Sequence, residues 1–484
     1  QDPTHEQTAF AVLEQAKLAL VPHVAPPSAE STALTDRTHP ADLQAEATQE
    51  LQQIRQLKQE LNRYYTQFHT PDAAFASDAD VARLHTAIVQ CELRLSNLLD
   101  SQRRLDFVSP DRDPMQPIPL PQLQAAIPSG TILLEYFFSE ERLTIFCIER
   151  TSFTVHRRHF CLEHLQDLVH QLRFQMNKFH LGTRFRERHR RLLQQSMDQV
   201  LQQFYQLLIA PVAGLLENAE HLIIVPHHLL HNLPFHAFFD GRHYLLETHG
   251  VSYAISATFH HLVQQQAMPA TFAPPLVLGL NDSLIRQAEQ EALAVAAIFP
   301  EAECYCGAAA TATHLQTANQ PRPFIHLATH GIFRSDNPVY SALKLADGWF
   351  TMQELAALRH SAPLITLSAC DTGRSETPRE TGLTDFYRSF FRSGAQAVVV
   401  SLWSLDDQAA IRIMTIFYEE LRRGRAVYDA LRTAQQRMMA RWRHPYYWAP
   451  FMLTGNPQLH HLVPSLGQEK QSGTSSRQLI ELHP

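Results

Sequence analysis

Apolar and polar residues alternate with different periods in two parts of the chain, and each period predicts a different kind of element. In the first part, apolar residues recur at helical spacing within 5–20, 43–69 and 78–106. Residues 21–42 interrupt this pattern with many Pro, Ser and Thr residues, which is typical of a linker. The second and third helical segments predict two antiparallel helices, which could be the last helices of a helical repeat array.

The pattern changes to that of β-strands after residue 128. Segments rich in β-branched and aromatic residues predict a three-stranded meander, formed by Thr131–Phe138, Arg142–Glu149 and Ser152–Arg158. Amphipathic spacing then predicts helices over 162–180 and 186–209.

Short, wholly apolar runs alternate with helical segments in the rest of the chain. The predicted strands are Leu222–Val225, Leu276–Leu280, Phe324–Ala328, Leu364–Ser368 and Ala397–Ser401. The predicted helices are Ile285–Phe299, Met352–Leu358, Thr384–Arg392 and Asp407–Arg422. Such strands are typical of a parallel sheet that is buried on both faces. We therefore predict an α/β fold, a mostly parallel sheet with helices on both faces, preceded by an N-terminal helical segment.

These patterns divide the chain into four expected segments. A helix with a Pro- and Ser-rich linker occupies 1–42, and a helical hairpin occupies 43–115. The α/β domain spans 116–463, and the polar residues 464–484 are expected to form a disordered tail.

Composition argues against several classes of function. The 484 residues have a formal net charge of −7 with acidic and basic residues interspersed, so we predict no contact with nucleic acid. No run of about 18 apolar residues predicts a membrane span. Six cysteines without a C-x-x-C pair favour a reducing, cytoplasmic location. Cys304 and Cys306 form a C-x-C, but no second ligand pair accompanies them, and we expect no metal.

Chemically active side chains follow three of the predicted strands. His330 follows Phe324–Ala328, and Cys370 follows Leu364–Ser368. Two adjacent acids, Asp406 and Asp407, come shortly after Ala397–Ser401. Because ligands of open parallel sheets bind beyond the carboxyl ends of the strands, we expect these side chains to gather at one edge.

A thiol beside an imidazole can perform nucleophilic catalysis. The imidazole of His330 accepts the proton of the Cys370 thiol, and the thiolate is a strong nucleophile. The backbone N–H groups of Gly331 and Cys370 are candidates for an oxyanion hole. Such a dyad needs no metal or organic cofactor. Taken alone, each residue has another interpretation, because a Cys or His at a strand end is commonly a packed core residue.

Six stretches of the sequence, in order, resemble the CHAT family of caspase-like cysteine peptidases. These are relatives of separase that often follow tetratricopeptide repeats. The stretches are IIVPHHLLHNLPFHAFFD (223–240), SYAISAT (252–258), FIHLATHGIF (324–333), LITLSACDTG (364–373), FFRSGAQAVVVSLWSLDDQAA (390–410) and HPYYWAPFMLTGNP (444–457). The resemblance implies a caspase-like fold over 116–463, with His330 as general base and Cys370 as nucleophile.

Separase-like relatives place an acidic residue of the S1 pocket after the strand that ends in Leu-Trp. Asp407 matches this position best, with Asp406 adjacent and Asp371 as a further candidate. An acidic S1 pocket selects Arg or Lys at P1, because a buried carboxylate needs a cationic partner. Alternatively, Asp406 or Asp407 caps the following helix.

The expected function is that of a cysteine endopeptidase that cleaves specific protein partners after a basic residue. Its substrate is a protein or peptide, and regulation is expected through the N-terminal region or a regulatory protein partner. A catalytically silent scaffold with the same fold is the alternative. A nucleotide-dependent switch is disfavoured, because neither G-x-x-x-x-G-K-[ST] nor G-x-G-x-x-G occurs.

Overall fold

The computed structural model describes most of the chain. The described residues are 3–19, 40–69, 78–106, 116–139, 141–282, 285–316, 320–332, 334, 337, 340–358, 362–368, 382–460 and 462. The predicted linker lies mainly outside these residues, and the predicted tail lies wholly outside them. The limits of the four expected segments stay a prediction.

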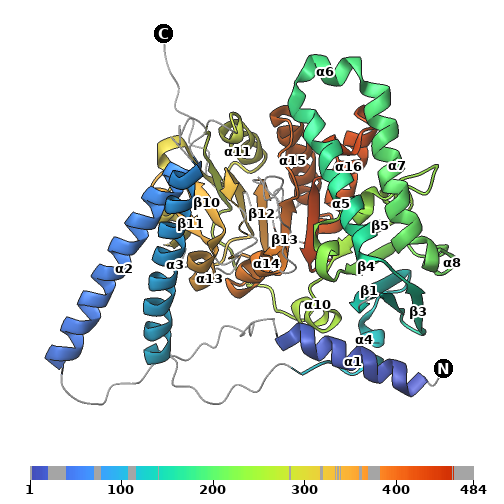
Figure 1. The fold of residues 1–484 in the computed structure, drawn as a ribbon, viewed down its shortest axis with the longest axis horizontal. Helices are drawn as coiled ribbons and strands as arrows, with labels where there is room; N and C mark the ends of the chain where they lie inside the picture. The colour runs from blue at the N-terminus through green and yellow to red at the C-terminus, as the bar shows by residue number, and fades with distance from the viewer. Residues whose placement is uncertain are drawn as a thin grey trace, which may run out of the picture.

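Three helices form the N-terminal part, as the apolar spacing predicted. They are α1 (Pro3–Ala19), α2 (Pro40–His69) and α3 (Asp78–Asp106). Helices α2 and α3 lie side by side, whereas α1 lies apart from them, below the β-meander (Figure 1). The ring of Phe10 in α1 packs against Phe146 and Phe153 of that meander.

The meander is confirmed and forms one end of a larger sheet. Its strands are β1 (Thr131–Ser139), β2 (Arg142–Ile148) and β3 (Phe153–His159). Strand β2 pairs antiparallel with both β1 and β3. Strand β1 also pairs in parallel with β4 (His221–Val225), which joins the meander to the rest of the sheet.

The large sheet has eleven strands in the order β3-β2-β1-β4-β5-β14-β13-β12-β8-β6-β7. Three strands have the predicted bounds: β8 (Phe324–Ala328), β12 (Leu364–Ser368) and β13 (Ala397–Ser401). Strand β6 (Leu276–Gly279) is one residue shorter than predicted. The sequence pattern missed β5 (Gly250–Tyr253), β7 (Glu303–Cys306) and β14 (Phe451–Gly455).

Strand β14 divides this sheet into two halves that run in opposite directions. It pairs in parallel with β5 at one position, Thr454 opposite Tyr253, and antiparallel with β13 at five positions. The strands β1, β4 and β5 are parallel to one another, and so are β13, β12, β8, β6 and β7. The carboxyl ends of the two halves therefore lie at opposite edges of the sheet.

Helices cover both faces of the sheet (Figure 1). Helix α11 lies on one face of the sheet, and α13 and α14 lie on the other. Crossovers between parallel strands are right-handed, and the chain crosses the sheet in one direction from β6 to β7 but in the opposite direction from β8 through β12 to β13. The predicted α/β fold, mostly parallel with helices on both faces, is confirmed. The remaining helices are α4 (Leu120–Ala126), α5 (Leu162–Asn177), α6 (Thr183–Arg188), α7 (Arg190–Leu208), α8 (Ala213–Leu216), α9 (Leu245–Thr248), α10 (Ala257–Gln264), α11 (Ala288–Ile298), α12 (Thr313–Gln316), α13 (Met352–Ala357), α14 (Gly382–Arg392), α15 (Asp407–Arg422) and α16 (Val427–Arg441).

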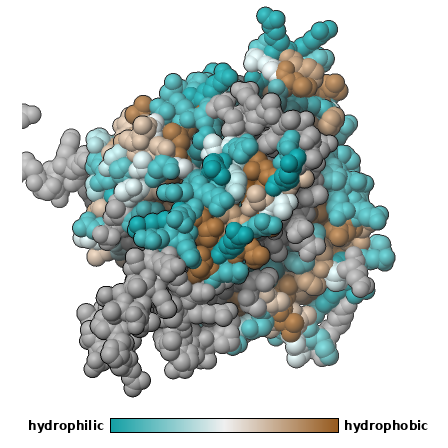
Figure 2. All heavy atoms as spheres, turned by 60° about the vertical axis from the view of Figure 1, so that its left-hand side comes forward, coloured by the Kyte–Doolittle hydropathy of each residue, from teal (hydrophilic) through white to brown (hydrophobic). Residues whose placement is uncertain are grey.

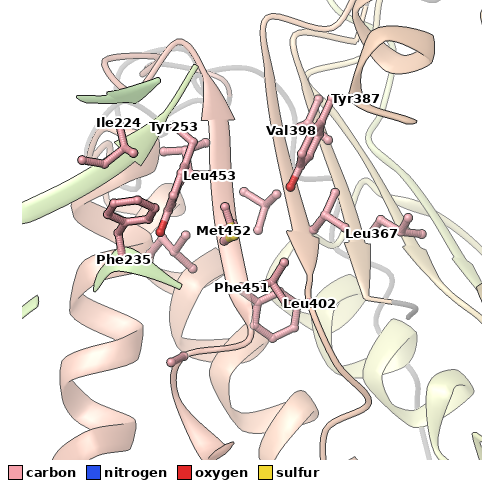
Figure 3. Packing of buried hydrophobic residues seen from close by; sticks show 14 of the residues in the cluster. Ile224, Phe235, Tyr253, Leu367, Tyr387, Val398, Leu402, Phe451, Met452 and Leu453 are labelled. Atoms are coloured by element: carbon pink, nitrogen blue, oxygen red, sulfur yellow. The ribbon is translucent and has the colours of Figure 1, made fainter. Parts of the chain in front are cut away.

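Apolar side chains fill the seam between the two halves of the sheet. Figure 3 shows Tyr253 of β5, Leu453 of β14 and Val398 of β13 within one cluster of buried residues. Gly455 ends β14 with φ at +108°, and a Cβ there would overlap the carbonyl oxygen of Gln396. Only glycine fits this close approach of two backbones.

A second sheet connects the α2–α3 pair to the main sheet. It is antiparallel and consists of β9 (Gly331–Ile332), β10 (Ala342–Leu345) and β11 (Gly348–Thr351). Ile332 and Trp349 from this sheet share a buried apolar cluster with Tyr65 of α2. The helical pair is therefore packed against the strands that follow β8.

Candidate active site

His330 lies between two paired strands and stands on a well-supported backbone. It follows the last residue of β8 by two positions and leads directly into β9. Its carbonyl oxygen accepts a hydrogen bond from the backbone N–H of Lys344 at 2.8 Å. The Thr329 hydroxyl donates to the carbonyl oxygen of Lys344. Strand β10 thus fixes the segment from which the imidazole projects.

The imidazole of His330 has a carboxylate partner. Its Nδ1 atom lies 2.8 Å from Oδ2 of Asp282, and the two side chains are only 6% and 7% exposed. Asp282 lies just beyond β6, where its Oδ1 accepts the backbone N–H of Ile285 at 2.8 Å. A carboxylate can only accept, so this hydrogen bond assigns the proton to Nδ1 and leaves the lone pair of the neutral ring on Nε2.

Two further side chains border this His–Asp pair. The ring of Trp349 meets the His330 ring edge-on, with the centroids 5.7 Å apart. Lys344 places Nζ 3.7 Å from Asp282 Oδ2 and 5.8 Å from the centre of the Trp349 ring. The carboxylate is therefore compensated by a cation in addition to its hydrogen bonds.

The strand that leads to Cys370 is the parallel neighbour of the strand that leads to His330. Ser368, the last residue of β12, pairs with Ala328, the last residue of β8. Each strand is followed two positions later by a predicted catalytic residue. Cys370 itself lies outside the described residues, as does Asp371, so their roles stay predictions. Gly331, the predicted oxyanion donor, is buried at the start of β9.

Asp406 occupies the N-cap position of α15, but its carboxylate makes no capping hydrogen bond. Instead, Oδ2 lies 3.4 Å from Nη2 and 3.5 Å from Nη1 of Arg186 in α6. Asp407 begins α15, and its side chain lies outside the described residues. The sequence left two roles open for Asp406, an S1 residue or a helix cap. Its observed contact is with an arginine and not with the backbone of the helix.

Sequence reasoning missed two of these residues for different reasons. Asp282 follows β6 by three positions, so the search beyond strand ends that found His330 would also have found it. Arg186 is 220 residues from Asp406 in sequence, and no local pattern marks it.

The Cys304–Cys306 pair is the other site that the sequence singles out for metal binding. In the described part of the chain, no group of three or more His, Cys, Asp and Glu side chains is arranged to hold a metal ion. The sulfur atoms of Cys304 and Cys306 lie 3.8 Å apart, and burial raises the pKa of the Cys306 thiol to about 12. Among the described helices, none has both the length and the apolar character needed to cross a membrane.

The CHAT domain family model matches residues 198–456, more than half of the chain. The chain belongs to the CHAT domain family. The match includes both halves of the sheet from β4 to β14 and contains Asp282, His330 and Cys370.

Curated relatives share shorter stretches with this CHAT protein. Tetratricopeptide repeat protein 28 of Mus musculus is 31% identical over 108 residues, which is 22% of this chain and 4% of that protein. The Homo sapiens protein of the same name is 30% identical over 131 residues, 27% of this chain and 5% of that protein. The matched part thus spans about a twentieth of these relatives.

A solved structure of a separase–securin complex from Saccharomyces cerevisiae has a similar fold. The TM-score is 0.50 at 12% sequence identity, over 70% of this chain and 30% of the yeast chain. At this identity the likeness concerns the fold alone, and it confirms the predicted similarity to separase.

Proposed function

We propose that this CHAT protein is a cysteine endopeptidase, with Cys370 as nucleophile and His330 as general base. One observation supports this most strongly: β8 and β12 are parallel neighbours that end in register, each two residues before one member of the dyad. Residues that follow such strands reach the same edge of a sheet. Membership of the CHAT family is consistent with this assignment.

In the proposed reaction, Nε2 of His330 takes the proton of the Cys370 thiol, and the sulfur attacks the peptide carbonyl carbon. The backbone N–H of Gly331 donates a hydrogen bond to the oxyanion that forms. The imidazolium then protonates the leaving amine, and water hydrolyses the resulting thioester. Asp282 is a positioning residue, because it orients the ring and stabilises its positive charge.

A basic P1 residue is the proposed specificity. Asp406 is one-third exposed at the carboxyl edge of β13, and its carboxylate already accommodates a guanidinium. Arg matches a carboxylate better than Lys because its planar fork can form two parallel hydrogen bonds. Asp407 and Asp371 stay candidates for the same pocket.

The α2–α3 pair is the proposed route for regulation, because it contacts the strands that support His330. The buried Glu92 of α3 lies 2.7 Å from Nη1 of Arg334, close after β9. The side-chain oxygen of Asn62 accepts the backbone N–H of Trp349, whose ring borders His330. A protein that displaces the helical pair would therefore disturb the support of the imidazole. The structurally similar yeast separase was solved in complex with securin, which fits a protein partner.

Cleavage profiling tests the enzymatic proposal. The wild-type chain and Cys370→Ala are incubated with a peptide library in which P1 is varied through all residues, with genetically linked proteins added as further substrates. We expect cleavage after Arg or Lys by the wild type, and none above background by Cys370→Ala with an unchanged melting temperature. Cys161→Ala is the matched control, since Cys161 is an exposed cysteine outside the site.

The catalytically silent scaffold is favoured by one observation, the low exposure of His330, 5% of the residue. A peptide probe with a thiol-reactive group separates the two functions. An enzyme labels at Cys370 before the exposed Cys161, because an imidazole-paired thiol is the more reactive nucleophile. A scaffold labels at Cys161 first.

A further inference from the structure

A helical projection reaches over the carboxyl edge of β13. Helices α5 and α7 rise from the sheet and are joined at their tip by the 3-10 helix Lys178–Leu181 and by α6 (Figure 1). The part of the molecule that projects furthest at the top of Figure 2 has both hydrophilic and hydrophobic residues on its surface. Leu181 and Leu192, which flank α6, are 62% and 59% exposed. The tip is thus exposed on one side and packed on the other.

The packed side of the tip rests on an aromatic cluster. Phe179 stacks on Tyr446 at 4.2 Å between ring centroids and contacts Tyr447 edge-on at 5.8 Å. Tyr446 in turn donates its hydroxyl to the carbonyl oxygen of Ser404, two residues before Asp406. The tip and the loop that follows β13 are therefore held together through Tyr446.

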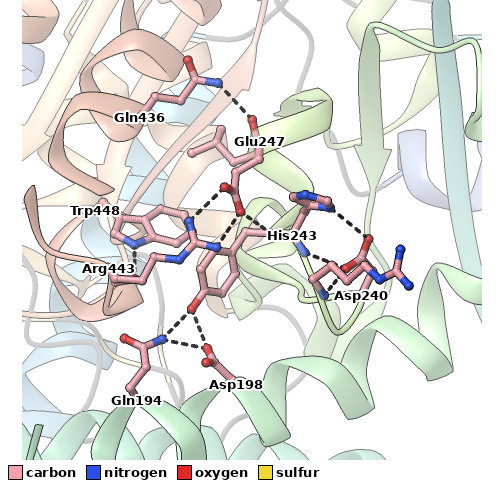
Figure 4. A network of polar contacts seen from close by, with 11 residues as sticks. Gln194, Asp198, Asp240, His243, Glu247, Gln436, Arg443 and Trp448 are labelled. Carbon is pink, nitrogen blue, oxygen red and sulfur yellow. Dashed lines mark hydrogen bonds and ion pairs between the residues drawn. The ribbon is translucent and has the colours of Figure 1, made fainter. Parts of the chain in front are cut away.

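The segment that bears these tyrosines is itself fixed by a polar network (Figure 4). Arg443 forms two hydrogen bonds of 2.9 Å with the carboxylate of Glu247. The Trp448 indole N–H donates to the carbonyl oxygen of Arg443 at 3.0 Å. Gln194 and Asp198, in the first turns of α7 after α6, extend this network through the Tyr244 hydroxyl. The backbone N–H of Tyr244 in turn donates to Glu247.

Arg186 on α6 uses only part of its bonding capacity on Asp406. Both guanidinium contacts go to one carboxylate oxygen, Oδ2, at 3.4 and 3.5 Å, and Nη2 also donates to the Thr183 hydroxyl at 3.0 Å. The Nε atom is buried without a hydrogen-bond partner among the described residues. The side chain of Asp406 is 34% exposed, whereas that of Arg186 is 15% exposed. An arginine that approaches from solvent could form the two-point contact that Arg186 does not make.

Asp406 lies on the same edge of the sheet as His330. The side chain of Gln408 donates to Gln287 at 2.5 Å, which joins the start of α15 to the start of α11. Gln287 belongs to the connection that begins at Asp282, the partner of His330.

We propose that Asp406 is a subsite for an arginine side chain, and that Arg186 is an internal competitor that fills it in the resting protein. A substrate arginine displaces Arg186 and pairs with both oxygens of Asp406. The inference rests on the proposed endopeptidase and names the group that limits access to its acidic pocket for a basic side chain. It assigns α6 the function of a built-in occupant of that pocket.

The test compares Arg186→Gln with Arg188→Gln, an exposed arginine on the same helix. Each is made in the full chain with Cys370→Ala, and binding of a fluorescent Arg peptide is measured against the same peptide with citrulline in place of Arg. Arg186→Gln should tighten binding of the Arg peptide about three- to fivefold, the upper part of the range expected for an ion pair near the surface. Citrulline binding and the Arg188→Gln protein should not change. Asp406→Asn should abolish the preference for Arg over citrulline.

The same variants with Cys370 intact separate this inference from the peptidase proposal. Lower KM for Arg peptides in Arg186→Gln, with kcat unchanged, supports both. Tighter Arg binding without any cleavage supports the subsite and argues against the peptidase. Cleavage after Arg that is equal in Arg186→Gln and Arg188→Gln overturns the internal competitor and leaves the peptidase standing. Arg186→Lys, which keeps the charge and loses the fork, gives an intermediate value if Arg186→Gln folds poorly.

Discussion

Two histidines occupy matching positions at opposite edges of the sheet, yet their surroundings differ. His330 follows β8 by two residues, and His227 follows the parallel strand β4 by two residues. Nδ1 of His330 faces the carboxylate of Asp282, so it carries a proton. Nδ1 of His227 accepts the backbone N–H of Phe138 at 3.2 Å, so the proton lies on Nε2. The partner of Nδ1, and not the position after a strand, decides whether Nε2 can act as a base.

The edge that contains His227 is occupied by the chain's own N-terminal helix. Glu14 of α1 accepts the backbone N–H groups of Ala257 and Thr258, at 3.1 and 2.6 Å. Lys17 of α1 lies 2.8 Å from the buried Glu135. Burial, with Lys17 nearby, lowers the pKa of His227 to about 4. The charged groups at this edge hold α1 against the sheet. Those at the other edge, Asp282 and Lys344, surround the imidazole of His330, whose Nε2 carries the lone pair.

Replacing each of the two histidines separately should give the largest difference in activity. His330→Gln should lower kcat/KM on the order of 10³-fold or to background, because the general base is lost. His227→Gln should leave kcat/KM within about twofold, because a ring at the opposite edge reaches no reacting atom. Both are measured with the peptide that the wild type cuts best. An equal loss in both variants contradicts the distinction.

Removing the charge of Asp282 tests what makes the His330 edge different. Asp282→Asn should lower kcat on the order of 10²-fold with little change in KM, because the ring loses its orientation and its imidazolium loses a counter-charge. Steady-state kinetics and thermal unfolding of the same samples measure this. Lys344→Met is the matched control, since it removes the cation 3.7 Å from Asp282 without touching the hydrogen bond to His330. A change in KM alone would assign Asp282 to substrate binding.

At the edge that contains His227, we expect a smaller effect, which concerns the stability of the fold and arises from Glu135. Burial and the neighbouring Glu14 raise the pKa of Glu135 to about 8, although Lys17 opposes the rise. The unfolded chain releases this proton near the ordinary value of 4.5, so the folded state holds more protons between these two pH values. The free energy of unfolding should therefore fall as pH rises through this window, by about 1.4 kcal/mol per pH unit from this group.

Glu135→Gln lacks this titration, so its stability relative to wild type should improve steadily from pH 5 to pH 8. Denaturant unfolding at several pH values in this range measures the difference between the two proteins. Parallel pH dependences would show that Glu135 ionises normally in the folded state.

The apolar runs of the sequence predicted the central strands well, because strands buried on both faces are wholly apolar. Phe324–Ala328, Leu364–Ser368 and Ala397–Ser401 were found with their exact bounds. Strand β7 was missed because it is a half-buried edge strand with the sequence ECYC. Strand β14, with the sequence FMLTG, was also missed, although Pro450 precedes it and Gly455 ends it.

Candidate site residues were predictable only where they follow a recognised strand. His330 lies where the strand rule placed it, and Asp282 lay within reach of the same rule. The pairing of Arg186 with Asp406 depends on how the α5–α7 projection folds over β13, which no local spacing encodes. The placement of the Cys370 thiol stays a prediction.

The single backbone pairing between β5 and β14 has a mechanical consequence. Thr454 and Tyr253 provide the only ladder position that joins the two described half-sheets, whereas β14 is tied to β13 at five. Because backbone pairing is sparse between β5 and β14, we expect the two half-sheets to separate there first under force or mild denaturant. We expect amide hydrogens on its two sides to exchange as two cooperative families, each with its own opening free energy.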